Sequence, residues 1–184
     1  MKKFTLVHGW EGSPTGNWFP WLQSALEKQG HIVIALEMPN AFHPVQDEWV
    51  THLKKSVGTP DTDTILIGHS LGGIAILRYL ERLAPEDKVG SIALVASFPQ
   101  SVGIPELASF FETSLDYAAV KSHISGSILA FQSQDDPYVP FENGILLRDE
   151  LGAKLITIEH GGHLNANNGY TEFPTLLNEL QSLL

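Results

Sequence analysis

The sequence contains no cysteine and has few basic residues. Without a thiol, a disulfide framework, a cysteine nucleophile and a cysteine-ligated zinc site are all excluded. Lysine and arginine together number 11, against 21 aspartate and glutamate residues, so the net charge is −10. Nucleic acids and anionic membrane surfaces bind basic patches, and this charge balance therefore argues against both as main partners.

Long hydrophobic runs are also absent. No segment approaches the roughly 18 consecutive apolar residues of a membrane-spanning helix. The chain starts with Met1 and two lysines, but the apolar run that follows, residues 4–7, ends at His8 and is too short for the core of a signal peptide. We therefore expect a soluble, cytoplasmic protein.

The composition that remains is typical of one globular domain. The chain has 184 residues, of which 43% are hydrophobic and 17% are charged. That length is enough to bury a full core and too short for two comfortable domains. We expect a single domain over residues 1–184.

Strand patterns alternate with helix patterns along the chain. The expected strands are 4–7, 31–36, 64–67, 91–96, 127–132 and 154–158. The expected helices are 18–29, 48–57 with Asp47 in its capping region, 71–83, 141–151 and 173–184. The apolar runs 93–96 and 155–158 lack period-two alternation, which is typical of parallel strands buried on both faces. The sequence predicts an α/β fold: a three-layer α/β/α sandwich with about six mainly parallel strands.

One long connection, residues 97–126, interrupts this alternation. Its aromatic residues are Phe98, Phe110, Phe111 and Tyr117. A connection of this length inside a domain usually has a function. The residues leave two roles open: a short cap over the active site, or crossover helices whose aromatic side chains pack on the sheet.

The segment Gly68-His69-Ser70-Leu71-Gly72 lies between a β-branched run and a helical pattern. This G-x-S-x-G arrangement of strand, turn and helix is typical of a turn that exposes a nucleophilic serine at the top of the sheet. Gly68, Gly72 and Gly73 remove side chains where the strand and the helix pass closely. The N–H groups at the start of the helix would face an oxyanion beside Ser70. The alternative is a glycine-rich turn that only packs the helix on the sheet.

A serine nucleophile needs a base, and the base needs an orienting carboxylate. Asp135 and Asp136 follow the strand 127–132, and His160 and His163 follow the strand 154–158. Carboxyl ends of parallel strands meet at one edge of a sheet, so these side chains can converge on Ser70. We favour His163 as the base, since the two preceding glycines let the chain turn back over the sheet.

A metal site at His160 and His163 is a weaker interpretation. Two histidines in a flexible loop, without a nearby group of carboxylates, make a poor zinc site. We expect neither a metal nor another cofactor.

Four stretches carry a resemblance to the α/β-hydrolase superfamily: HGWEGSPTGNWFPWL, GHSLGG, SQDDPYVP and the final GGH. More closely, the chain resembles small serine hydrolases of the retinoblastoma-binding protein 9 and YdeN type. The resemblance implies a minimal α/β-hydrolase fold with Ser70 as nucleophile, Asp136 as acid and His163 as base. The family's D-x-x-V-P pattern fits Asp136, and Asp135 is one residue out of register.

The oxyanion hole is expected to combine the backbone N–H of Leu71 with that of Trp10, in the loop after the first strand. The Trp10 ring itself is expected to pack under that loop. We expect His69 to be structural, with its side chain pointing away from Ser70, and His8 to brace the first loop.

These observations predict a serine hydrolase that cleaves small carboxylic esters through an acyl-enzyme, with amides or thioesters as alternatives. A short cap argues against long triglycerides. The resemblance also reaches proteins that bind other proteins. An interaction module with weak or no activity, and with a protein partner, is therefore the alternative function.

Overall fold

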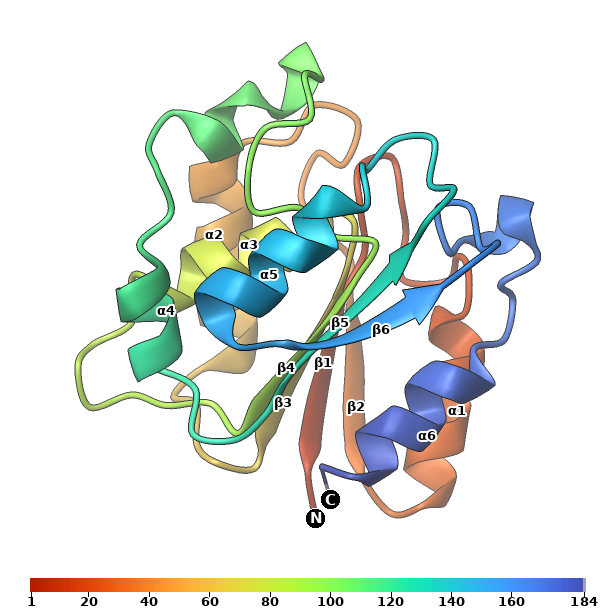
Figure 1. Ribbon diagram of the computed structural model, residues 1–184. Helices are drawn as coiled ribbons and strands as arrows, with labels where there is room; N and C mark the ends of the chain where they lie inside the picture. Colours follow the sequence, from red (N-terminus) through yellow and green to blue (C-terminus); the bar gives the residue numbers. More distant parts are fainter. Residues whose placement is uncertain (184) are drawn as a thin grey trace.

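The computed structural model describes residues 1–183, which form a six-stranded parallel sheet with helices on both faces (Figure 1). The strands are β1 (Lys3–Val7), β2 (Ile32–Leu36), β3 (Thr64–His69), β4 (Ser91–Val95), β5 (Ile128–Ser133) and β6 (Lys154–Ile158). Their order in the sheet is β2-β1-β3-β4-β5-β6, and every neighbouring pair is parallel. The predicted three-layer α/β architecture is confirmed.

Two apolar cores sandwich the sheet. Helices α1 (Phe19–Lys28) and α6 (Pro174–Gln181) cover one face, and α2 (Gln46–Val57), α3 (Leu71–Leu80) and α5 (Glu142–Leu151) cover the other (Figure 1). Successive residues of a strand alternate between the cores: Ile65 and Ile67 pack toward α1 and α6, whereas Leu66 packs toward α2 and α3. No helix within residues 1–183 combines the length and apolarity needed to cross a membrane.

The strands differ in burial according to their place in the sheet. Every residue of the inner strands β3, β4 and β5 is buried, as their unbroken apolar runs predict. The run 155–158 in β6 is only half-buried, and its Thr157 is exposed. The prediction that this run is buried on both faces is wrong, because β6 is an edge strand with a neighbour on one side only.

Three predicted helix boundaries also differ. Helix α2 begins at Gln46 after an extended Val45, so Asp47 lies in its first turn and its carboxylate pairs with Arg82 instead of capping the helix. Helix α3 ends at Leu80 because the following turn tightens to bonds between residues three apart, as in Leu83 N–H to Leu80 O. Helix α6 also ends earlier than predicted, at Gln181, because Ser182 and Leu183 bond to residues three positions back. The predicted end, Leu184, lies outside the described residues.

The long connection 97–126 contains a 3₁₀ helix, η1 (Pro105–Phe111), and α4 (Tyr117–Ser122). The buried guanidinium of Arg78 on α3 donates to the carbonyls of Phe110, Thr113 and Ser114 and so fastens the connection to α3. The first part of the connection borders the cavity described below, and the buried Phe98 and Phe110 belong to the core. The packing role thus has a structural counterpart in these two side chains, and the role as a cap stays a prediction.

Candidate active site

The turn between β3 and α3 holds Ser70 in a strained backbone conformation. Its φ and ψ are 53° and −121°, a region that residues other than glycine rarely adopt. The Ser70 N–H donates to the Val95 carbonyl over 2.8 Å, and the Ser70 carbonyl accepts from the Gly73 N–H and the Ser97 hydroxyl over 3.0 and 2.6 Å. Hydrogen bonds on both sides of the residue therefore hold the strained turn.

Close packing around the turn explains two of its glycines. A Cβ at Gly72 would collide with the backbone carbonyl of Val7 at the end of β1. A Cβ at Gly73 would collide with the Ser97 hydroxyl. These glycines therefore allow the start of α3 to approach both neighbouring strands, as the motif predicts.

His163 and Asp136 are in direct contact. The Nδ1 atom of His163 lies 2.8 Å from Oδ2 of Asp136, whose side chain is fully buried. A carboxylate only accepts hydrogen bonds, so Nδ1 carries the proton and Nε2 is free to accept one. The other carboxylate oxygen accepts from the N–H groups of Tyr138 and Val139, which fixes the carboxylate. Asp136 thus combines the turn-opening role and the histidine contact that its sequence position suggests.

Asp135 contacts the backbone of the histidine loop rather than its ring. Its Oδ1 accepts from the Ser133 hydroxyl over 2.6 Å and from the N–H groups of Gly161 and Gly162 over 2.9 and 2.8 Å. These bonds, that of Ser133 foremost, lower the pKa of Asp135 to about 2. His160 lies 3.6 Å from the second oxygen of Asp135, and its side chain is 88% exposed.

Three side chains hold the backbone on either side of the His163 ring. His69 Nε2 lies 2.9 Å from the His163 carbonyl, and because a carbonyl only accepts, Nε2 carries the proton. Trp18 Nε1 donates to the next carbonyl, that of Leu164, and Asn168 Oδ1 accepts from the His163 N–H. These bonds fix the position from which the imidazole projects.

His69 is buried, and this burial, more than any other effect, lowers its pKa to about 3. Its ring is therefore neutral at physiological pH, which suits a structural donor. The residue borders the same cavity as Ser70, and its Nε2 bonds to the His163 carbonyl rather than to Ser70.

His8 braces the first loop, as predicted. Its Nε2 accepts from the Met38 N–H over 3.1 Å, so Nδ1 carries the proton and donates to the Gly9 carbonyl over 2.8 Å. The ring packs edge-on against the buried Trp49. Burial lowers the pKa of His8.

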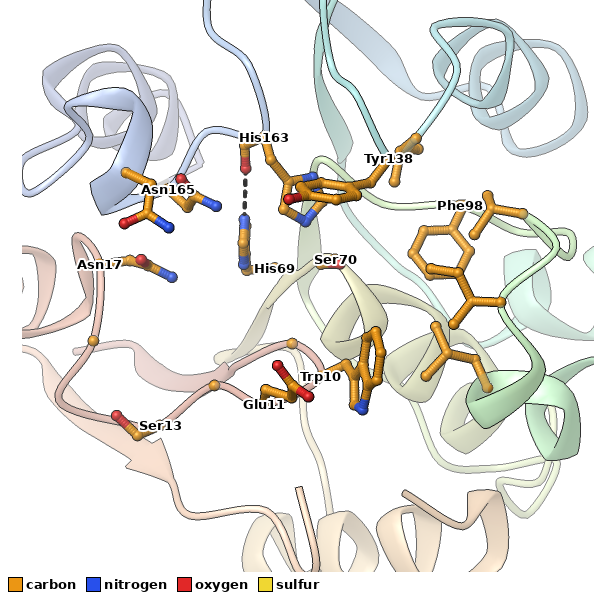
Figure 2. Close-up of a pocket in the computed structure, with 18 residues that line it drawn as sticks. Trp10, Glu11, Ser13, Asn17, His69, Ser70, Phe98, Tyr138, His163 and Asn165 are labelled. Carbon is orange, nitrogen blue, oxygen red and sulfur yellow. Dashed lines mark hydrogen bonds between the residues drawn. The ribbon is translucent and has the colours of Figure 1, made fainter. Parts of the chain in front are cut away.

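A cavity of about 420 Å³ brings Ser70, His163 and Trp10 together at the carboxyl ends of the strands (Figure 2). The loop after β1 passes directly over the serine: a Cβ at Gly9 would lie 2.9 Å from the Ser70 Cβ. Trp10 follows this glycine, and its indole N–H donates to the Phe42 carbonyl. The ring is thus tied to the neighbouring loop while the backbone passes Ser70.

The sequence did not point to several residues that support the site. Ser97 follows β4, the strand beside the serine turn. Its position directly after a strand is a signal from which the sequence could have indicated this residue. Trp18 and Asn17 carry no such signal, because their partners, the Leu164 carbonyl and the Ala166 N–H, lie far away in the chain. Asn168 accepts from the N–H of His163 in the same loop.

Within residues 1–183, no three histidine, aspartate or glutamate side chains gather in a way that would hold a metal ion.

Comparisons with known proteins agree on one family. The serine hydrolase family model matches residues 4–182. YdeN of Bacillus subtilis is 34% identical over 183 residues, which cover 98% of this chain and 95% of YdeN. The serine hydrolase RBBP9 of Rattus norvegicus is 30% identical over 173 residues, which cover 92% of this chain and 88% of RBBP9.

Solved structures give the same fold. The crystal structure of the B. subtilis ydeN gene product covers 100% of this chain and 98% of its own, with a TM-score of 0.95 and 33% identity. Mouse alpha/beta hydrolase domain-containing protein 10 covers 98% of this chain and 88% of its own, with a TM-score of 0.73 and 14% identity, and shares the fold. The chain belongs to the serine hydrolase family and has a minimal α/β-hydrolase fold.

Proposed function

We propose that this protein hydrolyses small carboxylic esters through an acyl-enzyme formed on Ser70. The contact of His163 Nδ1 with the buried Asp136 carboxylate carries the proposal. A carboxylate in this position fixes the tautomer in which Nε2 can take the serine proton, and it stabilises the imidazolium that results. A histidine with only a packing role would not need a buried anionic partner.

The reaction has two halves. His163 takes the proton of the Ser70 hydroxyl as the oxygen attacks the ester carbonyl, and the same proton passes to the leaving alcohol. Water, deprotonated by His163, then attacks the acyl-enzyme, which releases the acid and returns the proton to Ser70. Asp136 stays ionised throughout.

The backbone N–H groups of Leu71 and Trp10 are proposed to hold the oxyanion. Leu71 opens α3, so its N–H has no partner within the helix and lies at the positive end of the helix dipole. Trp10 lies next to Gly9, which packs on Ser70. Two such donors commonly contribute several kcal/mol to transition-state stabilisation.

Labelling with a fluorophosphonate probe tests this function, with Ser70→Ala as the control. An activated serine reacts with the probe, and the alanine variant does not. Short-chain p-nitrophenyl esters should be hydrolysed by the wild type and not by Ser70→Ala. A wild-type protein that neither reacts with the probe nor hydrolyses any ester would instead favour the interaction module without activity.

A further inference from the structure

The cavity beside Ser70 has two chemically different halves. One half has apolar side chains from the long connection and from the loop after β5, namely Phe98, Val102, Ile104, Leu107 and Val139. The other half has polar side chains from the loops after β1 and β6, namely Glu11, Ser13, Asn17, Asn165 and Asn167. Figure 2 shows Phe98 on one side of Ser70, and Asn17 and Asn165 on the opposite side.

The two halves also differ in exposure. Phe98, Leu107 and Val139 are at most 2% exposed, so the apolar half is closed at its base. In the polar half, Glu11 and Asn167 are exposed, and Asn17 is half-buried. The apolar half is therefore closed at its base and half-buried at Val102 and Ile104, whereas the polar half opens to solvent at Glu11 and Asn167.

From this division, and resting on the proposed function, we propose that the enzyme cleaves esters of short apolar acids with polar alcohols that are not anionic. The acyl group occupies the apolar half and the leaving alcohol the polar half. In the acylation step the bond from Ser70 Oγ to the acyl carbon forms, the bond from that carbon to the alcohol oxygen breaks, and the Ser70 proton reaches the alcohol through His163.

The hydrolytic step supports this orientation. The attacking water must stand where the alcohol stood, because both exchange their proton with the same His163 nitrogen. Asparagine and serine side chains can hydrogen-bond that water, whereas apolar walls cannot. The side of the cavity that is polar and open to solvent therefore suits both the alcohol and the water that replaces it.

Charge at the cavity selects against anionic alcohols. Among the described residues that border the cavity, Glu11 is the only one with a carboxylate, and none is a lysine or arginine. Glu11 is exposed, and its own φ is positive, at 55°. A hydrogen bond from its N–H to the Ala41 carbonyl holds the backbone at this position. A negative leaving group would meet this carboxylate without a cationic partner.

Size limits the acid. A volume of about 420 Å³ is near the lower end of the range for small-molecule sites. The acyl group and the alcohol of the substrate must share this volume. We therefore expect acyl chains of about four carbons to be preferred over longer ones.

The test measures kcat/KM for butyrate esters of four alcohols: glycerol, choline, n-butanol and glycolate. We expect the glycerol and choline esters to exceed the butyl ester, and the glycolate ester to be roughly tenfold poorer than the glycerol ester. Glu11→Gln should remove most of the penalty on the glycolate ester. The matched control is Glu106→Gln, which removes an exposed carboxylate from the long connection 97–126. Glu106 does not border the cavity, so this variant should leave the ranking unchanged.

Two further variants test the orientation. Asn167→Leu should shift the alcohol ranking toward butanol and leave the acyl-length preference unchanged. Ile104→Ala should lengthen the preferred acyl chain in a series of glycerol esters and leave the alcohol ranking unchanged. If Ile104→Ala does not fold, Val102→Ala replaces it, because Val102 is half-buried in the same half of the cavity.

The opposite result is that Ile104→Ala changes the alcohol ranking and Asn167→Leu changes the acyl-length preference. It would overturn the proposed orientation, with the acyl group in the apolar half and the alcohol in the polar half. A wild-type preference for the butyl or glycolate ester would overturn the substrate class, while Ser70-dependent hydrolysis would leave the proposed function standing. Loss of both fluorophosphonate labelling and all ester hydrolysis would overturn the proposed function, and this inference with it.

Discussion

Asp135 and Asp136 are adjacent in the chain and hold two different parts of the same histidine loop. Asp136 contacts the ring of His163 through Nδ1, whereas Asp135 accepts from the backbone N–H groups of Gly161 and Gly162. The first contact acts on the protonation of the imidazole. The second acts on the path of the loop that carries it.

This division predicts unequal effects of the two Asp→Asn variants. Asp136→Asn should reduce kcat by roughly 10⁴, because an amide can favour the wrong histidine tautomer. Asp135→Asn should reduce it far less, since the amide oxygen can still accept from Gly161 and Gly162. Steady-state kinetics on one ester, with circular dichroism to establish folding, measures both. The reverse ranking would assign the triad acid to Asp135.

The two histidines of the loop are expected to differ just as clearly. His163→Gln should abolish esterase activity, because the proton acceptor beside Ser70 is lost. His160→Gln should stay within about threefold of wild type, since its side chain is 88% exposed and points to Asp135. Its pH profile should also keep the fall in kcat/KM at acidic pH. Loss of that fall in the His160 variant alone would show that His160 is the base.

Ser97 is expected to act on kcat through the serine turn. Ser97→Ala removes the 2.6 Å bond to the Ser70 carbonyl and leaves a strained residue with less support. We expect kcat to fall by roughly tenfold with little change in KM. Ser125→Ala is the matched control, because it removes a similar bond, to the Val89 carbonyl, away from the cavity. Equal effects of both variants on kcat would contradict a positioning role for Ser97.

Much of the fold and the proposed triad could be predicted from the sequence because their signals are local. The apolar runs of β3, β4 and β5 mark buried parallel strands, and the glycines around Ser70 mark the turn. The burial of residues 155–158 could not be predicted, since nothing in the run says that β6 lies at the edge. The loop contacts of Trp18 and Asn17 were equally hidden, because their partners are Leu164 and Ala166.

The buried His69 should make the protein sensitive to acid. Its folded-state pKa is lowered to about 3, below the value near 6.5 of the unfolded chain. Below pH 6.5 the unfolded chain therefore binds a proton that the folded protein does not. The contribution of neutral His69 to the free energy of unfolding is fully present above pH 6.5, and it is lost by up to ~1.4 kcal/mol per pH unit as the pH falls toward 3.

His69→Gln, which keeps a donor for the His163 carbonyl, should weaken this dependence. Urea unfolding of both proteins at pH 7.5, 6 and 5 measures it. His123→Gln is the control, as His123 is also buried beside a carbonyl, that of Asp87. The same pH dependence in wild type and His69→Gln would contradict a neutral, buried His69.

Capture of the acyl-enzyme tests covalent catalysis by Ser70 most directly. The protein is mixed with p-nitrophenyl butyrate, quenched in acid within the first turnover and analysed by intact mass and peptide mapping. We expect one butyryl group on the peptide that contains Ser70, and none on the Ser70→Ala variant. A butyryl group on another residue, or turnover of the ester with no covalent adduct even in the deacylation-impaired Asp136→Asn variant, would contradict nucleophilic catalysis by Ser70.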